Sequence, residues 1–327
     1  MVVQSWVWWV SVAVLLSFLV VDVAVIGRRP HEPSLRESST AIAFYVALAL
    51  VFGLGLWLLV GAGAAVQFYA GWLTEYSLSV DNLFVFIVIM SRFAVPKPLQ
   101  QTALLVGIIL ALVLRGAFIA VGAAALQRFT WVFYVFGALL VWAAVRLVRG
   151  EPGDSQEFEQ TRFMRWVLAH VPATSSYHGV RLVTRVAGRR VATPMLLVIL
   201  ALGSTDLLFA LDSIPAIFGL TKEPYLVFTA NVFALMGLRQ LYFLIGGLID
   251  RLVYLSHGLA VVLGFIGVKL VLEALHDNDL PFINGGRAVG WAPQLPIWAS
   301  LLVIVVTLAV TAAASLARDR MRRGAAE

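Results

Sequence analysis

Residues 101–124 read QTALLVGIILALVLRGAFIAVGAA, an apolar run that contains a single charged residue, Arg115. A helix needs about 20 apolar residues to cross a bilayer, so this run predicts a transmembrane helix. Further apolar segments lie at 4–26, 41–64, 66–91, 131–148, 194–219, 225–246, 255–275 and 296–316. The sequence therefore predicts an all-α, polytopic membrane helical bundle of about nine transmembrane helices.

The composition excludes several other classes of protein. The chain is 61% apolar and 13% charged, whereas soluble domains are about one-quarter charged. It has no cysteine, which excludes disulfides, thiolate metal sites and cysteine nucleophiles. It also has no Walker motif, no H-E-x-x-H motif and no Ser/His/Asp pattern. We therefore expect neither an enzyme nor ATP-driven transport by this chain alone.

The basic residues predict the orientation of the chain. If the spans alternate in direction, most basic residues of the connections and the tail lie on one side of the membrane. They are Arg28, Arg29, Arg36, Arg92, Lys97, Arg149, Arg162, Arg165, Arg181, Arg185, Arg189, Arg190, Arg318, Arg320, Arg322 and Arg323. The connections on the other side carry little more than Arg128, Lys222 and Arg287. The positive-inside rule places this side in the cytoplasm and the amino terminus outside, in a bacterial inner or plasma membrane. The formal charge of +6 is explained in this way, and we expect no nucleic-acid partner. Segment 4–26 is interpreted as a retained helix and not as a signal peptide.

Two of the predicted spans share a polar pattern. Residues 74–82 read TEYSLSVDN and residues 205–213 read TDLLFALDS, so each has Thr, an acid, five residues, Asp and a small amide or hydroxyl residue. The span after each has an arginine and a glycine seven residues later, Arg115 with Gly122 and Arg239 with Gly246. Because a unit of three helices is odd, the second copy enters from the opposite side. The pattern predicts an inverted repeat of three-helix units, as in many secondary transporters.

This repeat divides the chain into five parts. We expect two N-terminal transmembrane helices in 1–64, the first three-helix unit in 65–148, a cytoplasmic linker in 149–193, the second, inverted unit in 194–275, and an external loop, a last helix and a basic cytoplasmic tail in 276–327. A flexible linker is the preferred interpretation of 149–193. An amphipathic surface helix over 162–170 is the alternative.

Acidic residues within apolar spans are the features that point to function, namely Glu75, Asp81, Asp206 and Asp212. A charged residue at the centre of a membrane helix costs roughly 2.5–3.5 kcal/mol. We expect Glu75 or Asp81 to pair with Arg115. We likewise expect Asp206 or Asp212 to pair with Arg239. If all are ionised, four carboxylates and two guanidiniums leave two negative charges, which one divalent cation or two protons would neutralise.

Helix geometry places these acids in the middle of the bundle. Glu75, Ser79 and Asn82 form one polar stripe, and Thr74, Ser77 and Asp81 form another. A helix that is polar on two faces cannot face lipid with either, so spans 66–91 and 194–219 should be central. Pro215 should also loosen the second of these helices beside Asp212 and free the carbonyl of Leu211 as a cation ligand.

The available ligands are hard oxygen donors, which suit Mg²⁺, Ca²⁺ or Mn²⁺. The predicted metal ligands are Glu75, Asp81, Asn82, Asp206, Asp212, Ser213 and Asn231, with Arg115, Arg239 and Lys269 balancing the charge. Asn231 has the alternative role of interhelical contact. Lys269 and Glu273 are four residues apart, which favours a structural pair over a role in transport. Asp22 is interpreted as an interfacial partner of Arg28 and Arg29.

These motifs resemble the TerC family of bacterial membrane proteins. The resemblance lies in EYSLSVDNLFVF at 75–86, in Ser204 to Pro215 and in NVFALMGLRQLYF at 231–243, and it extends from Trp6 to Pro281. It implies an association with tellurium-resistance clusters, alkaline-induced proteins and export of Mn²⁺ from the cytoplasm. It also implies that Glu75, Asp81, Asp206 and Asp212 are the family's intramembrane acids.

The leading hypothesis is a secondary exporter of divalent cations, above all Mn²⁺, through a midplane acidic site, with protons exchanged for metal. The metal is then a substrate, and we expect no prosthetic group. Transport of another cation (Ca²⁺, H⁺ or Na⁺) is one alternative. A non-transporting membrane scaffold with structural ion pairs is the other. The expected partners are the metal ion and the lipid bilayer, and the small residues from Gly61 to Ala65 are compatible with a homo-oligomer.

Overall fold

The structure is a computed structural model that describes residues 8–14, 17, 34–129, 131–149, 173–174, 176–186, 189–245, 254–276, 278, 280 and 283–324. Its long helices are α2 (Leu35–Leu59), α3 (Ala62–Arg92), α4 (Lys97–Arg128), α5 (Val132–Arg149), α7 (Pro194–Phe218), α8 (Pro224–Leu235), α9 (Leu238–Ile245), α10 (Leu255–His276) and α11 (Ile297–Gly324). Eight spans in the described residues, with α8 and α9 counted together, are long and apolar enough to cross a membrane. The predicted polytopic helical bundle is confirmed. Most of predicted span 4–26, with Asp22, lies outside the described residues.

Local signals in the sequence set several helix ends. Ser34 caps α2 by accepting a hydrogen bond from the Glu37 amide at 3.2 Å. Pro194 and Pro224 occupy the first positions of α7 and α8, where a missing amide hydrogen costs nothing. Gly61 separates α2 from α3 with a φ of 125°, a conformation that residues with a Cβ avoid.

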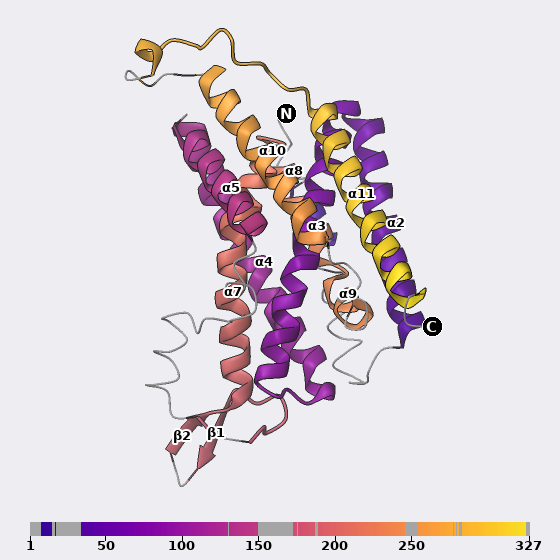
Figure 1. Cartoon of the computed structure of the whole chain (residues 1–327). Helices are drawn as coiled ribbons and strands as arrows, with labels where there is room; N and C mark the ends of the chain where they lie inside the picture. The colour runs from indigo at the N-terminus through magenta and orange to yellow at the C-terminus, as the bar shows by residue number, and fades with distance from the viewer. Residues whose placement is uncertain are drawn as a thin grey trace.

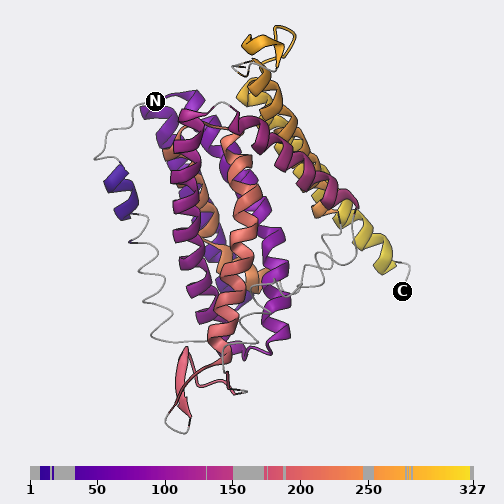
Figure 2. The same cartoon turned by 90° about the vertical axis from the view of Figure 1, so that its left-hand side faces the viewer.

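The two helices that carry the acidic motifs lie in the centre of the bundle, as predicted. Within their apolar windows 56% of the residues of α3 and 61% of those of α7 are buried, against 17% for α2 and 11% for α11. In the view of Figure 1, α2 and α11 both lie on the right-hand side of the bundle. Figure 2 shows α5, α10 and α11 as an inclined group beside the upright helices. Together with the span over α8 and α9, which is 78% buried, the polar helices form the interior of the bundle.

Helix contacts follow the pattern that a two-fold relation between the units would produce. The packed pairs include α3 with α8, α4 with α7, α3 with α7 and α5 with α10. If α3, α4 and α5 correspond to α7, α8–α9 and α10, exchanging the units converts the α3–α8 contact into the α7–α4 contact. The other two contacts map onto themselves. This pattern supports the inverted repeat, and the boundaries of its units stay a prediction.

The helix interruption lies at a different place from the predicted one. The segment predicted as one span over 225–246 is two helices, and Met236 between them has a non-helical ψ of 39°. In contrast, α7 is continuous through Pro215 to Phe218, so the proline does not interrupt the helix beside Asp212. Pro215 lies in the last turn of α7, where its missing amide removes only the hydrogen bond to the carbonyl of Leu211. The role of this carbonyl as a cation ligand stays a prediction.

Part of the predicted linker is a β-hairpin. Strands β1 (Val183–Val186) and β2 (Arg189–Ala192) pair antiparallel, with Val183 opposite Ala192. The Tyr177 hydroxyl donates to the carbonyl of Phe93 at 2.7 Å, which joins this connection to the end of α3. The described part of 149–193 therefore contains local β structure, and its role as the linker between the two units stays a prediction. The alternative surface helix over 162–170 lies outside the described residues.

Candidate functional site

A buried ion triad of Glu75, Arg115 and Asp206 links three helices at the centre of the bundle. Arg115 of α4 donates from Nη2 to Asp206 Oδ1 at 3.0 Å and from Nε to Asp206 Oδ2 at 3.3 Å. Its Nη1 forms an ion pair with Oε1 of Glu75 on α3. The side chains of Arg115 and Glu75 are 1% and 0% exposed, and that of Asp206 on α7 is 4% exposed. One guanidinium thus neutralises two carboxylates only in part, and the triad has a net charge of −1 if all three are ionised.

Small residues bring α4 and α7 close enough for this contact. A Cβ on Gly203 would lie 2.4 Å from Leu110 Cδ2, and a Cβ on Gly107 would lie 3.3 Å from Leu202 Cδ1. Small residues at such crossings let membrane helices approach closely. Because Gly203 is one turn before Asp206, this approach places the carboxylate within reach of Arg115.

The two acidic motifs place their first acids in the same way. The hydroxyl of Thr74 donates to the Ala70 carbonyl at 2.8 Å. Thr205 donates to the Ala201 carbonyl at the same distance. Each threonine is thus satisfied within its own helix, and the carboxylate that follows it is left to interact with Arg115.

Buried polar atoms without hydrogen-bond partners occur on the same helices. Within the described part of the chain they include Oε2 of Glu75, the hydroxyls of Ser79 and Ser213, and both amide atoms of Asn231 on α8. Ser79 follows Glu75 by one helical turn, and Ser213 follows Asp206 by two. Buried polar groups are nearly always hydrogen-bonded, so buried groups without a protein partner indicate positions that a water molecule or an ion would satisfy. These atoms are mostly carboxylate, amide and hydroxyl oxygens, which fit a hard divalent cation.

The structure brings together only some of the predicted site residues. Asn82 and Asn231 are buried, as is Ser213. Asp212 and Arg239 are half-buried. The side chain of Asp81 lies outside the described ones. In the described residues no group of three or more His, Asp or Glu side chains is placed to hold one metal ion. Arg115 lies between the two acids that meet, so a cation that binds both must first displace part of its contacts.

Two predicted ion pairs need correction. Asp206 or Asp212 was expected to pair with Arg239. Asp206 instead accepts two hydrogen bonds from Arg115, because α4 of one unit packs against α7 of the other, and Asp212 forms no ion pair in the described part of the chain. Glu273 was expected to pair with Lys269, and its charge does act on Lys269, but the direct ion pair of its carboxylate is with Lys222 at 2.8 Å. Lys222 Nζ also lies 4.6 Å from the centre of the Phe133 ring, which fixes its position near Glu273.

Sequence reasoning missed Ser79 as a site residue. It lies in the polar stripe with Glu75 and is 1% exposed, with a hydroxyl that has no partner in the described residues. Its spacing of four residues from Glu75 was the available signal. The break between α8 and α9 was also missed, and the Met236-Gly237 pair was its only sign.

Comparison with known proteins gives one family. The profile of the integral membrane protein TerC family matches residues 60–323. The uncharacterized membrane protein Rv2723 of Mycobacterium tuberculosis is 47% identical over 319 residues, 97% of this chain and 80% of the relative. The chloroplastic thylakoid membrane protein TERC of Arabidopsis thaliana is 42% identical over 243 residues, 74% of this chain and 63% of the relative. The putative membrane-bound redox modulator Alx of Escherichia coli is 33% identical over 326 residues, 97% of each chain. No solved structure matches.

Proposed function

Because the chain belongs to the integral membrane protein TerC family, we propose that it is a secondary transporter that exports divalent cations, above all Mn²⁺, from the cytoplasm. The observation that carries the proposal is the buried triad of Glu75, Arg115 and Asp206 with its net negative charge. Intramembrane ionisable residues are rare and mark ion pathways in many transporters. The choice of Mn²⁺ and of export as the direction of transport rests on the resemblance to the TerC family described above.

The charge balance supports a cation as the transported species. Arg115 neutralises one of the two acids that it binds. A cation that displaces Arg115 from Asp206 would meet a carboxylate. Further oxygens that lack partners in the described residues lie two turns along α7 at Ser213 and on α8 at Asn231. Protonation of the acids would release the cation again, so alternating occupancy by metal and protons gives exchange. Arg115 would hold the acids together in the empty site.

The distribution of basic residues supports the orientation of the transporter. The β-hairpin carries Arg185, Arg189 and Arg190, and Figure 1 shows it toward the same end of the bundle as the C-terminus. The positive-inside rule assigns this end to the cytoplasm. On this basis the amino terminus is outside and the protein lies in a bacterial inner or plasma membrane.

A structural scaffold is the second candidate, and the triad itself favours it. Arg115 joins three helices through its ion pairs with Glu75 and Asp206, as a structural ion network would. A redox role, which the name of the E. coli relative suggests, would have to use groups other than thiols, because the sequence has no cysteine.

Metal uptake into proteoliposomes tests the proposal. We would compare Mn²⁺, Ca²⁺ and Mg²⁺ for the wild type, Glu75→Gln and the control Glu37→Gln, which changes an exposed acid at the start of α2. We expect saturable Mn²⁺ flux that Glu75→Gln abolishes and Glu37→Gln retains. If folded Glu75→Gln protein moves Mn²⁺ as fast as the wild type, the triad is structural and the scaffold becomes the better explanation.

A further inference from the structure

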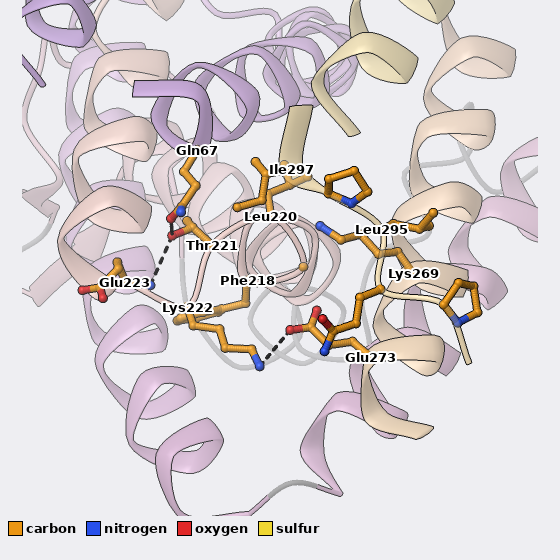
Figure 3. Close-up of a pocket in the computed structure, with 14 residues that line it drawn as sticks. Gln67, Phe218, Leu220, Thr221, Lys222, Glu223, Lys269, Glu273, Leu295 and Ile297 are labelled. Carbon is orange, nitrogen blue, oxygen red and sulfur yellow. Dashed lines mark hydrogen bonds and ion pairs between the residues drawn. The ribbon is translucent and has the colours of Figure 1, made fainter. Parts of the chain in front are cut away.

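A pocket of about 720 Å³ lies where the end of α7 meets α10 and the chain before α11. Its walls include loop residues 219–223 and residues 293–297. Figure 3 shows it with its labelled side chains. The end of α7 is twelve residues beyond Asp206, or about 18 Å along the helix axis. The pocket is therefore separate from the triad, and what binds in it does not depend on cation transport.

Lys269 is the unusual residue of this pocket. Its side chain extends from α10 into the pocket toward Leu220 (Figure 3), although the residue is only 6% exposed. Within the described residues no carboxylate forms an ion pair with it, and no hydrogen bond satisfies its ammonium group. A buried ammonium without a counter-charge is costly, so charged groups of this kind are normally paired.

The neighbouring acids form no ion pair with Lys269 in the described residues. Glu273 is one turn along α10 and attracts Lys269 through its charge, but its carboxylate is bound by Lys222 at 2.8 Å. Figure 3 shows Glu223 on the opposite side of the pocket from Lys269. The charged residues of the lining are two lysines and these two glutamates. The Lys269 ammonium thus faces the interior of the pocket with no carboxylate bound to it.

A second donor lies in the same pocket. The Thr221 hydroxyl donates to Oε1 of Gln67 at 2.5 Å. This bond orients the Gln67 amide, whose Nε2 has no hydrogen-bond acceptor among the described residues. A planar amide donor and a buried ammonium in one cavity are suited to an oxyanion and unfavourable for a metal cation.

We propose that this pocket binds a phosphate group, held by the Lys269 ammonium. A water molecule takes about 30 Å³ in the liquid, so the pocket has room for a group much larger than one small ion. Apolar residues such as Leu220, Leu295 and Ile297 form part of the wall and suit the organic part of a phosphate ester. The phosphate comes either from an acidic lipid headgroup or from a free phosphate ion, and the experiment distinguishes the two.

The chain offers a direct probe of Lys269, because it has only three lysines, Lys97, Lys222 and Lys269. Reductive ¹³C-methylation keeps their charge and gives each an NMR signal, which single Lys→Arg variants assign. We would titrate sodium phosphate into the detergent-solubilised wild-type chain, with sodium chloride at equal ionic strength as the control. For a free phosphate ion we expect the Lys269 signal to shift saturably with phosphate alone, while the Lys97 signal does not move.

The lipid source is tested by native mass spectrometry. The protein is taken from nanodiscs of phosphatidylglycerol and phosphatidylcholine in equal amounts, as wild type, Lys269→Met and the matched control Lys97→Met. For a lipid headgroup we expect the wild type and Lys97→Met to retain one phosphatidylglycerol several-fold more often than Lys269→Met. If phosphate leaves the Lys269 signal unmoved and the wild type shows no preference for phosphatidylglycerol, the proposal is overturned. The NMR titration and the lipid-retention measurement both use the folded wild type, so they test the proposal even if Lys269→Met does not fold.

Discussion

Replacing Arg115 by methionine should destabilise the protein more than any neutral substitution of its acidic partners. Arg115→Met leaves Glu75 and Asp206 facing each other, both 4% exposed or less. Removing one member of a buried ion network costs about 3–5 kcal/mol, because it leaves uncompensated charge. Asp206→Asn keeps one acceptor for Arg115 and leaves its pair with Glu75. It should therefore cost only about 2 kcal/mol, the value of a hydrogen bond to a charged group.

The triple variant Glu75→Gln/Arg115→Met/Asp206→Asn separates charge from packing. Because it has no charge left to compensate, its free energy of unfolding should lie within about 1 kcal/mol of the wild type. The assay is unfolding by sodium dodecyl sulfate in mixed micelles, followed by circular dichroism, with the single variants in the same series. A triple variant as unstable as Arg115→Met, or an Arg115→Met variant as stable as the wild type, would refute the reasoning.

Three further predictions concern other parts of the bundle. A Cβ on Gly137 would lie 2.8 Å from the Gly267 carbonyl oxygen, so Gly137→Ala should lower the free energy of unfolding by about 1–3 kcal/mol. The control Gly55→Ala has no atom within 4 Å of its new Cβ and should leave the free energy of unfolding unchanged. Asn231→Leu removes two buried atoms without partners in the described residues, so thermal stability should hold while Mn²⁺ flux falls. Burial raises the pKa of Tyr177, so its contribution to stability is present below its ordinary pKa and is lost as pH rises through the raised one. Tyr177→Phe should abolish this alkaline loss in pH-dependent thermal unfolding, and hydrogen exchange near Phe93 should rise at neutral pH.

The spans and the central position of the acidic helices could be predicted from the sequence, because the bilayer leaves few choices. Backbone groups in lipid must bond within a helix, so apolar length alone identified α4 and α10. Polar residues on two faces of the helix containing Glu75 excluded a lipid-facing position. The buried Thr74 and Asn82 agree with that deduction.

The ion-pair partners of the charged residues could not be predicted from the sequence. The spacing of residues along one helix shows which of them share a helix face, but it does not show which other helix packs against that face. The bond between Arg115 and Asp206 depends on how closely α4 approaches α7, which Gly203 and Leu110 decide through contacts between units. Lys269 and Glu273 have suitable spacing for a pair within α10, yet a loop lysine binds the glutamate. The break at Met236 lies within an apolar run, so hydropathy does not show it, and the Met236-Gly237 pair alone does not predict it.

Asp212 provides the last test, because the triad alone cannot neutralise a divalent cation. With Glu75 and Asp206 shared with Arg115 the site has a charge of −1, and a bound divalent cation would bring it to +1. A further acid must join, and Asp212 lies six residues beyond Asp206, about 9 Å along α7. It is half-buried and forms no ion pair in the described part of the chain, so it contributes little to the fold through pairing. Asp212→Asn should leave the free energy of unfolding within about 1 kcal/mol of the wild type and still abolish Mn²⁺ flux in proteoliposomes. A variant that unfolds like Arg115→Met would make Asp212 a structural residue, and one that transports Mn²⁺ normally would remove it from the pathway.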